Sequence, residues 1–232
     1  MNTRQKGYNI SADVYGYNEA YYLPPMEGVS RIEMLRGAAS LQFGSQFGGL
    51  VNYVTNDAPL HKPFEFTTSQ TFGSFGLFNS FNAIGGSYKK LSYYPFLQYR
   101  SIDGYRPNHQ QWQPSGFGQL HYKATEKLKL GVEYSLLRNR VKMPGGLTDS
   151  LFNSNPKAST RARNWIRTPW NIVSANAVYT PSENTTISLQ TSYLFRHRSL
   201  VWRNADGGPA ALVENDPVAH LYEPRAVWNS ED

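Results

Sequence analysis

The sequence predicts an all-β protein, in which a small mixed sheet is followed by part of an antiparallel transmembrane β-barrel. Aromatic residues make up 14% of the chain, with 16 Tyr and 12 Phe, whereas charged residues make up only 17%. This composition favours strands over helical surfaces. After residue 64, segments of about ten residues alternate between apolar and polar side chains, as the strands of outer-membrane barrels do. The connections between these segments are short at one edge of the expected sheet and long at the other.

The first element is a compact sheet within residues 1–60. It begins with Ile-Glu-Met-Leu-Arg-Gly at 32–37, continues through Phe-Gly at 43–44 and ends with Gly-Gly-Leu-Val-Asn-Tyr-Val-Thr at 48–55. The glycines mark turns where the backbone needs a positive φ or a close approach. They stand at Gly37, Gly44, Gly48 and Gly49. By itself, this pattern also fits a glycine-rich hairpin of a soluble β domain.

Seven longer strands are expected after residue 60. Their ranges are 64–73, 76–88, 90–101, 115–124, 127–138, 170–180 and 184–199. The clearest is 127–138, where Leu130 and Val132 share one face and Lys129 and Glu133 share the other. Pro95 interrupts the third strand. No apolar run approaches the roughly 18 residues of a spanning helix, and the negative mean hydropathy of −0.54 fits strands with one polar face.

The connections are sorted by length. Those at 88–90, 124–126 and 181–183 are tight turns, whereas those at 102–114, 139–169 and from residue 200 onward are long, with 73–75 as the one short exception. Outer-membrane barrels have this asymmetry, with turns in the periplasm and loops outside. Because an open sheet edge is costly in lipid, we expect further strands after residue 232. The start lacks a secretory signal, so we expect an internal piece of a longer protein.

The loop expected at 139–169 carries most of the net charge of +6. It contains one acidic residue, Asp149, and six basic residues, which are Arg140, Lys142, Lys157, Arg161, Arg163 and Arg167. A basic loop above a pore focuses anions, and guanidinium groups bind carboxylates in bidentate fashion. Arg161 and Arg163 are therefore candidate ligand-binding residues. A solvated loop, or one that pairs with anionic lipopolysaccharide, explains the charge equally well.

The sequence carries no pattern of an enzyme or of a resident cofactor. It has no cysteine, and its five histidines lack metal-binding spacing. No Gly-x-Ser-x-Gly or phosphate-binding glycine loop occurs. Nucleic-acid binding is disfavoured because the basic residues cluster in one loop, with only Trp165 and Trp170 as stacking aromatics nearby. We therefore expect no catalytic residue, no protein-bound metal and no nucleic-acid partner.

The motif at 32–55, in its order and spacing, resembles the plug of TonB-dependent outer-membrane receptors. The resemblance implies that residues 1–60 are the C-terminal part of a plug and residues 61–232 the first strands of its barrel. It implies import of an iron chelate or similar nutrient across the outer membrane of a Gram-negative bacterium. TonB, with its inner-membrane energising complex, and outer-membrane lipid are then the partners. It also implies that Arg36, with Glu33, latches the plug to the wall; the alternative is a local ion pair worth about 0–1 kcal/mol.

A second resemblance is narrower. Met-Pro-Gly-Gly-Leu at 143–147, after the fifth long strand, is similar to the ferric-dicitrate transporter subgroup. It implies that Arg198, at the end of strand 184–199, contacts citrate carboxylates, with Arg225 as a second candidate. Tyr17 and Asn18 take the place of an apical plug loop that touches substrate, although the subgroup has a glutamine-rich loop there. Uptake of another siderophore, a sugar or a peptide stays open, as does a soluble carbohydrate-binding domain or a surface adhesin.

Overall fold

The computed structural model describes residues 2–11, 21–37, 43, 49–202 and 212–230, the last of these by their backbone. It confirms the all-β class, with two sheets. The first sheet has the order β2-β1-β4-β3. Its strands are β1 (Asn2–Gln5), β2 (Tyr8–Asn9), β3 (Val29–Leu35) and β4 (Leu50–Thr55), and a 3-10 turn, η2 (Met26–Gly28), precedes β3. Because β1 and β4 run parallel and the other pairs antiparallel, the sheet is mixed, as predicted.

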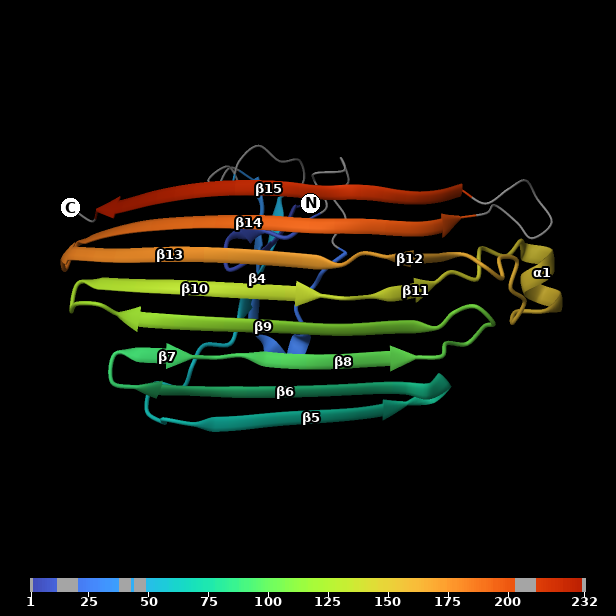
Figure 1. Cartoon of the computed structure of the whole chain (residues 1–232), viewed down its shortest axis with the longest axis horizontal. Helices are drawn as coiled ribbons and strands as arrows, with labels where there is room; N and C mark the ends of the chain where they lie inside the picture. Colours follow the sequence, from blue (N-terminus) through green and yellow to red (C-terminus); the bar gives the residue numbers. More distant parts are fainter. Residues whose placement is uncertain (1, 12–20, 38–42, 44–48, 203–211, 231–232) are drawn as a thin grey trace.

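The second sheet is an antiparallel meander, shown in Figure 1. Its long strands are β5 (Glu65–Gly73), β6 (Leu77–Tyr88), β9 (Gln111–Lys123), β10 (Leu128–Leu137), β13 (Trp170–Ser182), β14 (Thr185–Trp202) and β15 (Leu212–Ser230). Between β6 and β9, the short strands β7 (Leu91–Tyr93) and β8 (Phe96–Ile102) together occupy one strand position. The break between them falls at Pro95, which has no N–H to donate to a ladder.

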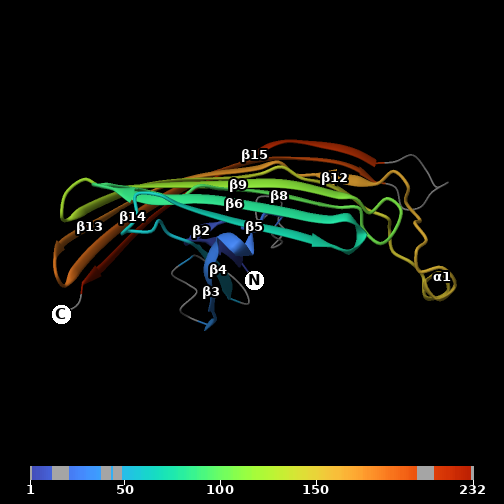
Figure 2. The ribbon, with the colours of Figure 1, turned by 90° about the horizontal axis from the view of Figure 1, so that it is seen from below.

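The meander is apolar on its outer face, whereas its inner face carries most of its buried polar side chains together with the apolar ones that contact the first sheet. In β10, Val132 is 52% exposed and flanked on the same face by Leu130 and Tyr134, whereas Glu133 and Ser135 point inward and are buried. Figure 2 shows the first sheet under the concave face of the second. An exposed apolar face opposite a polar inner face is the reverse of a soluble sandwich, and it fits a barrel wall that faces lipid.

The two edges of the meander differ, as the connection lengths predicted. On the turn edge, two-residue connections at 89–90 and 183–184 and a four-residue one at 124–127 join the strands. On the opposite edge, here called the loop edge, lie η4 (Ser74–Gly76), residues 103–110 and the segment with helix α1 (Asp149–Ser154). The turn edge lies at the left of Figure 1 and the loop edge at the right.

The prediction of a loop from residue 200 onward was wrong. β14 continues to Trp202, and β15 pairs with it from residue 212 to residue 230, as an eighth strand position. Two prolines, Pro217 and Pro224, hid this strand because proline normally excludes a central strand. Pro217 lies where the β14–β15 register shifts, between the pairs Arg196–Ala219 and Arg198–Asp216, and a bulge is a position at which proline is tolerated.

The segment 139–169 is also less of a loop than predicted. Residues 140–142 form β11 (Arg140–Lys142) and residues 165–167 form β12 (Trp165–Arg167), which pair with each other and lengthen the wall at the loop edge. Strands of three residues are too short to show an alternation. Between them, Thr148 caps helix α1 by accepting a 3.3 Å hydrogen bond from the Leu151 N–H. No helix in the described part of the chain is long and apolar enough to cross a membrane.

Two buried clusters join the sheets. In one cluster, three side chains from the first sheet and the segment that follows it pack against the second sheet. Its members are Tyr8, Ile10, Tyr22, Leu137, Trp170, Ile172 and Leu194. The second gathers around Phe96 and includes Ala58, Phe81, Ala83, Tyr94 and Phe117. Both lie between the small sheet or its exit segment and the concave face of the meander. The small sheet is therefore packed against the wall and not merely tethered to it.

The contact between Gly28 and Phe96 predicts a strong effect of a single methyl group. A Cβ at Gly28 would lie 2.7 Å from Cε1 of Phe96, whose ring is held by Phe81 and Phe117 at centroid distances of 5.2 and 5.3 Å. We expect Gly28→Ala to lower the free energy of unfolding by about 1–3 kcal/mol, measured by urea titration in detergent. Gly118→Ala, where a Cβ meets open space, is the matched control. Equal stability of the two variants would contradict this packing.

Candidate functional site

A charged cluster joins the small sheet to the wall. Lys6, in the turn between β1 and β2, places its ammonium 2.9 Å from Asp57 Oδ1 and 3.4 Å from Glu133 Oε1, and it donates a hydrogen bond to Gln119 Oε1. The side chain of Glu133 is only 2% exposed and that of Lys6 only 14%. Burial raises the pKa of Asp57, but the ammonium of Lys6 and the amide of Gln119 outweigh burial and hold this pKa below its usual range. Asp57 therefore stays ionised beside Lys6.

A second polar group lies beside this cluster and is fully buried. Gln5 Nε2 donates to the Tyr8 hydroxyl at 2.7 Å and to Ser135 Oγ at 3.1 Å, and the Tyr22 hydroxyl donates to Gln5 Oε1 at 3.0 Å. Burial raises the pKa of Tyr8 and of Tyr22 well above the usual value, so both remain neutral donors. In this network, Gln5 is hydrogen-bonded to Tyr8 and Tyr22 at the small sheet and to Ser135 of the second sheet. These hydroxyl and amide groups therefore have hydrogen-bond partners although they are buried.

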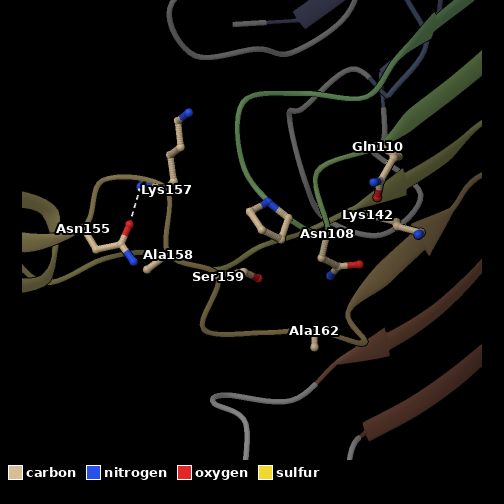
Figure 3. Close-up of a pocket in the computed structure, with 9 residues that line it drawn as sticks. Asn108, Gln110, Lys142, Asn155, Lys157, Ala158, Ser159 and Ala162 are labelled. Carbon is tan, nitrogen blue, oxygen red and sulfur yellow. Dashed lines mark hydrogen bonds between the residues drawn. The ribbon is translucent and has the colours of Figure 1, made fainter. Parts of the chain in front are cut away.

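The third feature is a pocket of about 700 Å³ at the loop edge. Figure 3 shows its lining, which comes from the β8–β9 loop, from β11 and from the segment after α1. Two lysines, Lys142 and Lys157, bring positive charge, and amide or hydroxyl groups of Asn108, Gln110, Asn155 and Ser159 complete the polar part of the lining. The pocket thus suits a ligand that is anionic and rich in oxygen.

The loops around this pocket hold each other in place. Asn108 Nδ2 donates to the carbonyl oxygens of Arg161 at 2.6 Å and Asn164 at 3.1 Å. Arg106 Nε donates to the carbonyl oxygen of Ala158 at 2.7 Å. Asn108 has a φ of 54°, a conformation that asparagine tolerates better than most residues. These bonds tie the β8–β9 loop to the segment after α1, so the pocket is fixed by the packing of both loops.

Aromatic rings position several of the loop cations. The guanidinium of Arg161 lies 4.3 Å from the ring centroid of Trp202, and that of Arg140 lies 5.4 Å from the ring centroid of Trp165. The ammonium of Lys157 lies 5.5 Å from the centroid of Tyr105. Such contacts hold a cation in place through its attraction to the face of the aromatic ring. The loop edge therefore presents ordered positive charge, as the sequence predicted for the 139–169 segment.

The predicted arginines occupy different environments. Arg161 packs on Trp202, Arg163 is exposed, and Arg198 lies on β14 opposite Asp216, just after a bulge in the β14–β15 ladder. Its neighbour Arg196, which sequence reasoning missed, is only 2% exposed and lies 4.7 Å from the ring centroid of Trp170. Arg196 shares the inward face of β14 with Ser192 and Leu194, and that alternation is the signal by which it could have been found.

One of the two predicted latch residues, Glu33, has partners within the small sheet. The carboxylate of Glu33 accepts hydrogen bonds of 2.8 Å from Asn52 Nδ2 and from Arg31 Nε. The Asn52 bond outweighs partial burial and, with Arg31, holds the pKa of Glu33 below its usual range. Arg36 is exposed. Glu33 thus pairs with Arg31 within the small sheet, and the described charged contact between this sheet and the second sheet is made by Lys6.

The remaining predicted ligand residues are only partly described. Tyr17 and Asn18 lie outside the described residues. Arg225 is placed by its backbone on β15, opposite Gln190 of β14. Among the described residues, no group of three His, Cys, Asp or Glu side chains is arranged to hold a metal ion.

A mixed sheet packed on the concave side of an antiparallel wall with an apolar outer face resembles the arrangement of a plugged outer-membrane barrel. From here the first sheet with its connecting segments is called the plug and the meander is called the wall. The chain matches no protein-family model and no curated protein. Similarity to solved structures, in contrast, extends over nearly the whole chain.

The fold is that of siderophore receptors. The ferric citrate transporter FecA in its unliganded form is 17% identical, with a TM-score of 0.75 over 98% of this chain and 34% of that one. The siderophore receptor PiuA from Acinetobacter baumannii is 11% identical, with a TM-score of 0.75 over 99% and 35%. FpvA from P. aeruginosa, bound to an iron–pyoverdine complex, is 16% identical, with a TM-score of 0.73 over 92% and 30%. The chain therefore spans about a third of the length of these structures.

Proposed function

We propose that this chain is part of a TonB-dependent transporter that carries a ferric chelate across the outer membrane of a Gram-negative bacterium. Residues 1–60 form the C-terminal part of its plug, and residues 61–232 form the first strands of its barrel. The observation that carries the proposal is a plug sheet packed on the polar inner face of a wall whose outer face is apolar. Such a barrel is closed to passive flow, so import needs energy, which TonB and its inner-membrane complex supply.

The proposed substrate is a ferric carboxylate chelate of the ferric citrate type. The pocket at the loop edge supports this choice, because Lys142 and Lys157 line it together with neutral hydrogen-bonding groups. Iron arrives already chelated, so the protein recognises the charge and oxygen atoms of the chelate and needs no ligand to the metal itself. Arg161 and Arg163, from the same loop, add positive charge near this pocket. The chemistry required of the site is binding and release, with no covalent step.

The other sequence-derived roles remain part of the proposal. Arg198 and Arg225 are proposed to contact the chelate from the wall, and Tyr17 and Asn18 from the plug. Arg36 and Glu33 are proposed to latch the plug to parts of the barrel outside this chain. Outer-membrane lipid is proposed to cover the apolar outer face of the wall.

Removing the two pocket lysines tests the proposed substrate. We expect Lys142→Ala with Lys157→Ala to weaken binding of ferric citrate to the full-length receptor about tenfold or more, because loss of one charge-assisted contact at about 1.4 kcal/mol is already tenfold. Fluorescence or calorimetric titration measures it. Lys89→Ala with Lys90→Ala removes the same charge at the turn edge and is the matched control.

Two results would contradict the proposal. The first is the absence of any affinity of the unaltered receptor for ferric citrate. The second is an equal loss of affinity in the turn-edge control, since this would mean that net charge alone attracts the chelate. A parallel titration with other iron–siderophore complexes is warranted, because the similar structures include receptors for a pyoverdine and for enterobactin.

A further inference from the structure

The plug meets the wall in two different ways. Against β10, β13 and β14, the contact is closely packed, with the buried cluster around Trp170 and Tyr22 and the hydrogen bond from Gln5 to Ser135. Gln190 of β14 adds a 3.0 Å hydrogen bond from its Nε2 to the carbonyl oxygen of Lys6. This side, here called the docked side, is held by apolar packing, by hydrogen bonds and by the charges around Lys6.

Against β5, β6, β8 and β9, the plug leaves two cavities beside the buried cluster around Phe96, which Gly28 contacts. The first, of about 570 Å³, is here called the loop-side cavity; plug residues 21 and 23–27 line it, together with Thr71, Leu77, Asn79, Gln98, Arg100 and Gln113 of the wall. The second, of about 240 Å³, is called the turn-side cavity and is lined by Glu27, Asn56, Asp57, Pro59, Glu65, Thr67, Gly85 and Tyr94. Strand register orders the two, since Thr71 pairs with Asn79 toward the loop edge and Glu65 with Gly85 toward the turn edge.

Glu27 is the one residue that lines both cavities. Its Oε1 accepts a 2.8 Å hydrogen bond from Asn79 Nδ2 of the wall, so Glu27 separates the cavities while it bridges plug and wall. Glu27 lies in η2, a single 3-10 turn after Pro24 and Pro25, and it belongs to no strand of the plug sheet. Residues 23–27 can therefore shift without breaking a β-ladder.

The two cavities differ in charge. The loop-side cavity combines the guanidinium of Arg100 with the side-chain amides of Asn79, Gln98 and Gln113, groups that bind carboxylate and hydroxyl oxygens. None of the ion pairs formed within the described part of the chain involves Arg100. The turn-side cavity is lined by three acids, Glu27, Asp57 and Glu65. Arg100 attracts an anion into the first cavity, and the three acids of the second cavity repel it. The acids therefore oppose its onward movement until Glu27 moves away with residues 23–27.

We propose that the chelate crosses between plug and wall along β5, β6 and β8, through the loop-side and turn-side cavities, with Arg100 binding its carboxylates and the Glu27–Asn79 contact as the gate. The inference rests on the proposed function and deepens it by assigning the path and its selective residue. The docked side keeps its contacts during passage. The plug thus opens on one side and stays anchored on the other.

Cysteine tethers test the path, because the chain has no cysteine of its own. Glu27→Cys with Asn79→Cys, joined by a short bis-methanethiosulfonate reagent in the full-length receptor, closes the gate. Gln5→Cys with Ser135→Cys, joined in the same way, fixes the docked side. We expect the first tether to reduce uptake of radioactive ferric citrate at least tenfold and reductant to restore it, with binding at the cell surface unchanged. The second tether should leave uptake within twofold of that of its reduced form.

Uptake measured after reductant has cleaved the tether shows that each double-cysteine variant folds. If Gln5→Cys with Ser135→Cys does not fold, Lys6→Cys with Gln190→Cys tethers the same side, because Gln190 of β14 donates to the carbonyl oxygen of Lys6. Full uptake with the gate tether, or loss of uptake with the docked-side tether, overturns the proposed path. An unaltered receptor that neither binds nor imports ferric citrate would instead overturn the proposed substrate, and the path with it.

Arg100→Gln tests the selective residue without a tether. We expect the KM of uptake to rise about tenfold, as for the loss of one charge-assisted contact, while equilibrium affinity at the loop edge stays within twofold. Arg167→Gln removes an exposed arginine from outside both cavities and serves as the control. An unchanged KM in Arg100→Gln, or an equal rise in Arg167→Gln, would overturn the role of Arg100.

Discussion

Replacing Lys6 with Met is expected to destabilise the docked plug by about 3–5 kcal/mol, because a buried carboxylate then loses its cation. Glu133 is 2% exposed and Lys6 lies 3.4 Å from it. Methionine keeps most of the length and apolar surface of the lysine stem, so the loss reports the charge and not a cavity. Asp57 and Gln119 would also lose their contact with the ammonium. The measurement is urea unfolding of the plug in the detergent-solubilised receptor, followed by tryptophan fluorescence and by proteolysis.

The double variant Lys6→Met with Glu133→Gln provides the control for this prediction. Neutralising both partners removes the buried unpaired charge, so most of the lost stability should return. Arg31→Met, which removes the exposed partner of Glu33 within the plug, should cost less than about 1 kcal/mol. If Lys6→Met were as stable as Arg31→Met, the cluster around Lys6 would not anchor the plug.

Trp170→Ala is expected to destabilise the plug–wall contact by about 3–5 kcal/mol, the usual cost of deleting a large buried aromatic side chain. The Trp170 side chain is 1% exposed and packs with Tyr8, Ile10 and Tyr22 from the plug. It also lies under the buried guanidinium of Arg196, 4.7 Å from the ring centroid. Its removal therefore leaves a cavity and withdraws the aromatic face that accommodates a buried cation.

Trp170→Phe separates these two contributions, since it keeps an aromatic face and loses only part of the volume. We expect Trp170→Phe to lower the stability by no more than about half as much as Trp170→Ala does. Trp112→Ala, at a tryptophan that is 41% exposed, should cost less than Trp170→Ala in the same urea titration. A larger effect at Trp112 than at Trp170 would show that contact with detergent or lipid, and not plug docking, dominates stability.

Local patterns in the sequence predicted most of the wall. Alternation placed Val132 outward and Glu133 inward in β10, because successive side chains of a strand point to opposite faces whatever they contact. The strand that was missed, β15, contains Pro217 and Pro224, and a register shift interrupts its ladder with β14. The short strands β11 and β12 were missed because three residues carry no period. Both errors concern segments whose pairing is fixed by neighbours and not by their own pattern.

The candidate site was predicted less completely. The sequence placed the positive charge at the loop edge, and the structure gathers Lys142 and Lys157 of that loop around one pocket. It did not indicate Asn108 or Gln110, which reach the pocket from another loop. The predicted plug–wall latch at Arg36 and Glu33 came from a motif, whereas the described contact at Lys6 involves residues with no pattern in common. A linear sequence does not indicate which inward-facing acidic side chain of the wall will contact which basic side chain of the plug.

By itself, the sequence determined the all-β class, the faces of the long strands, the sorting of turns and loops, and the similarity of residues 32–55 to a plug. These follow from backbone geometry and side-chain alternation, which act over a few residues. Only the tertiary structure decided where the plug is docked, where it leaves cavities and which charges are buried together. Those features depend on the fit between two separately formed sheets, and the residues involved, such as Glu27 and Asn79, come from distant parts of the chain.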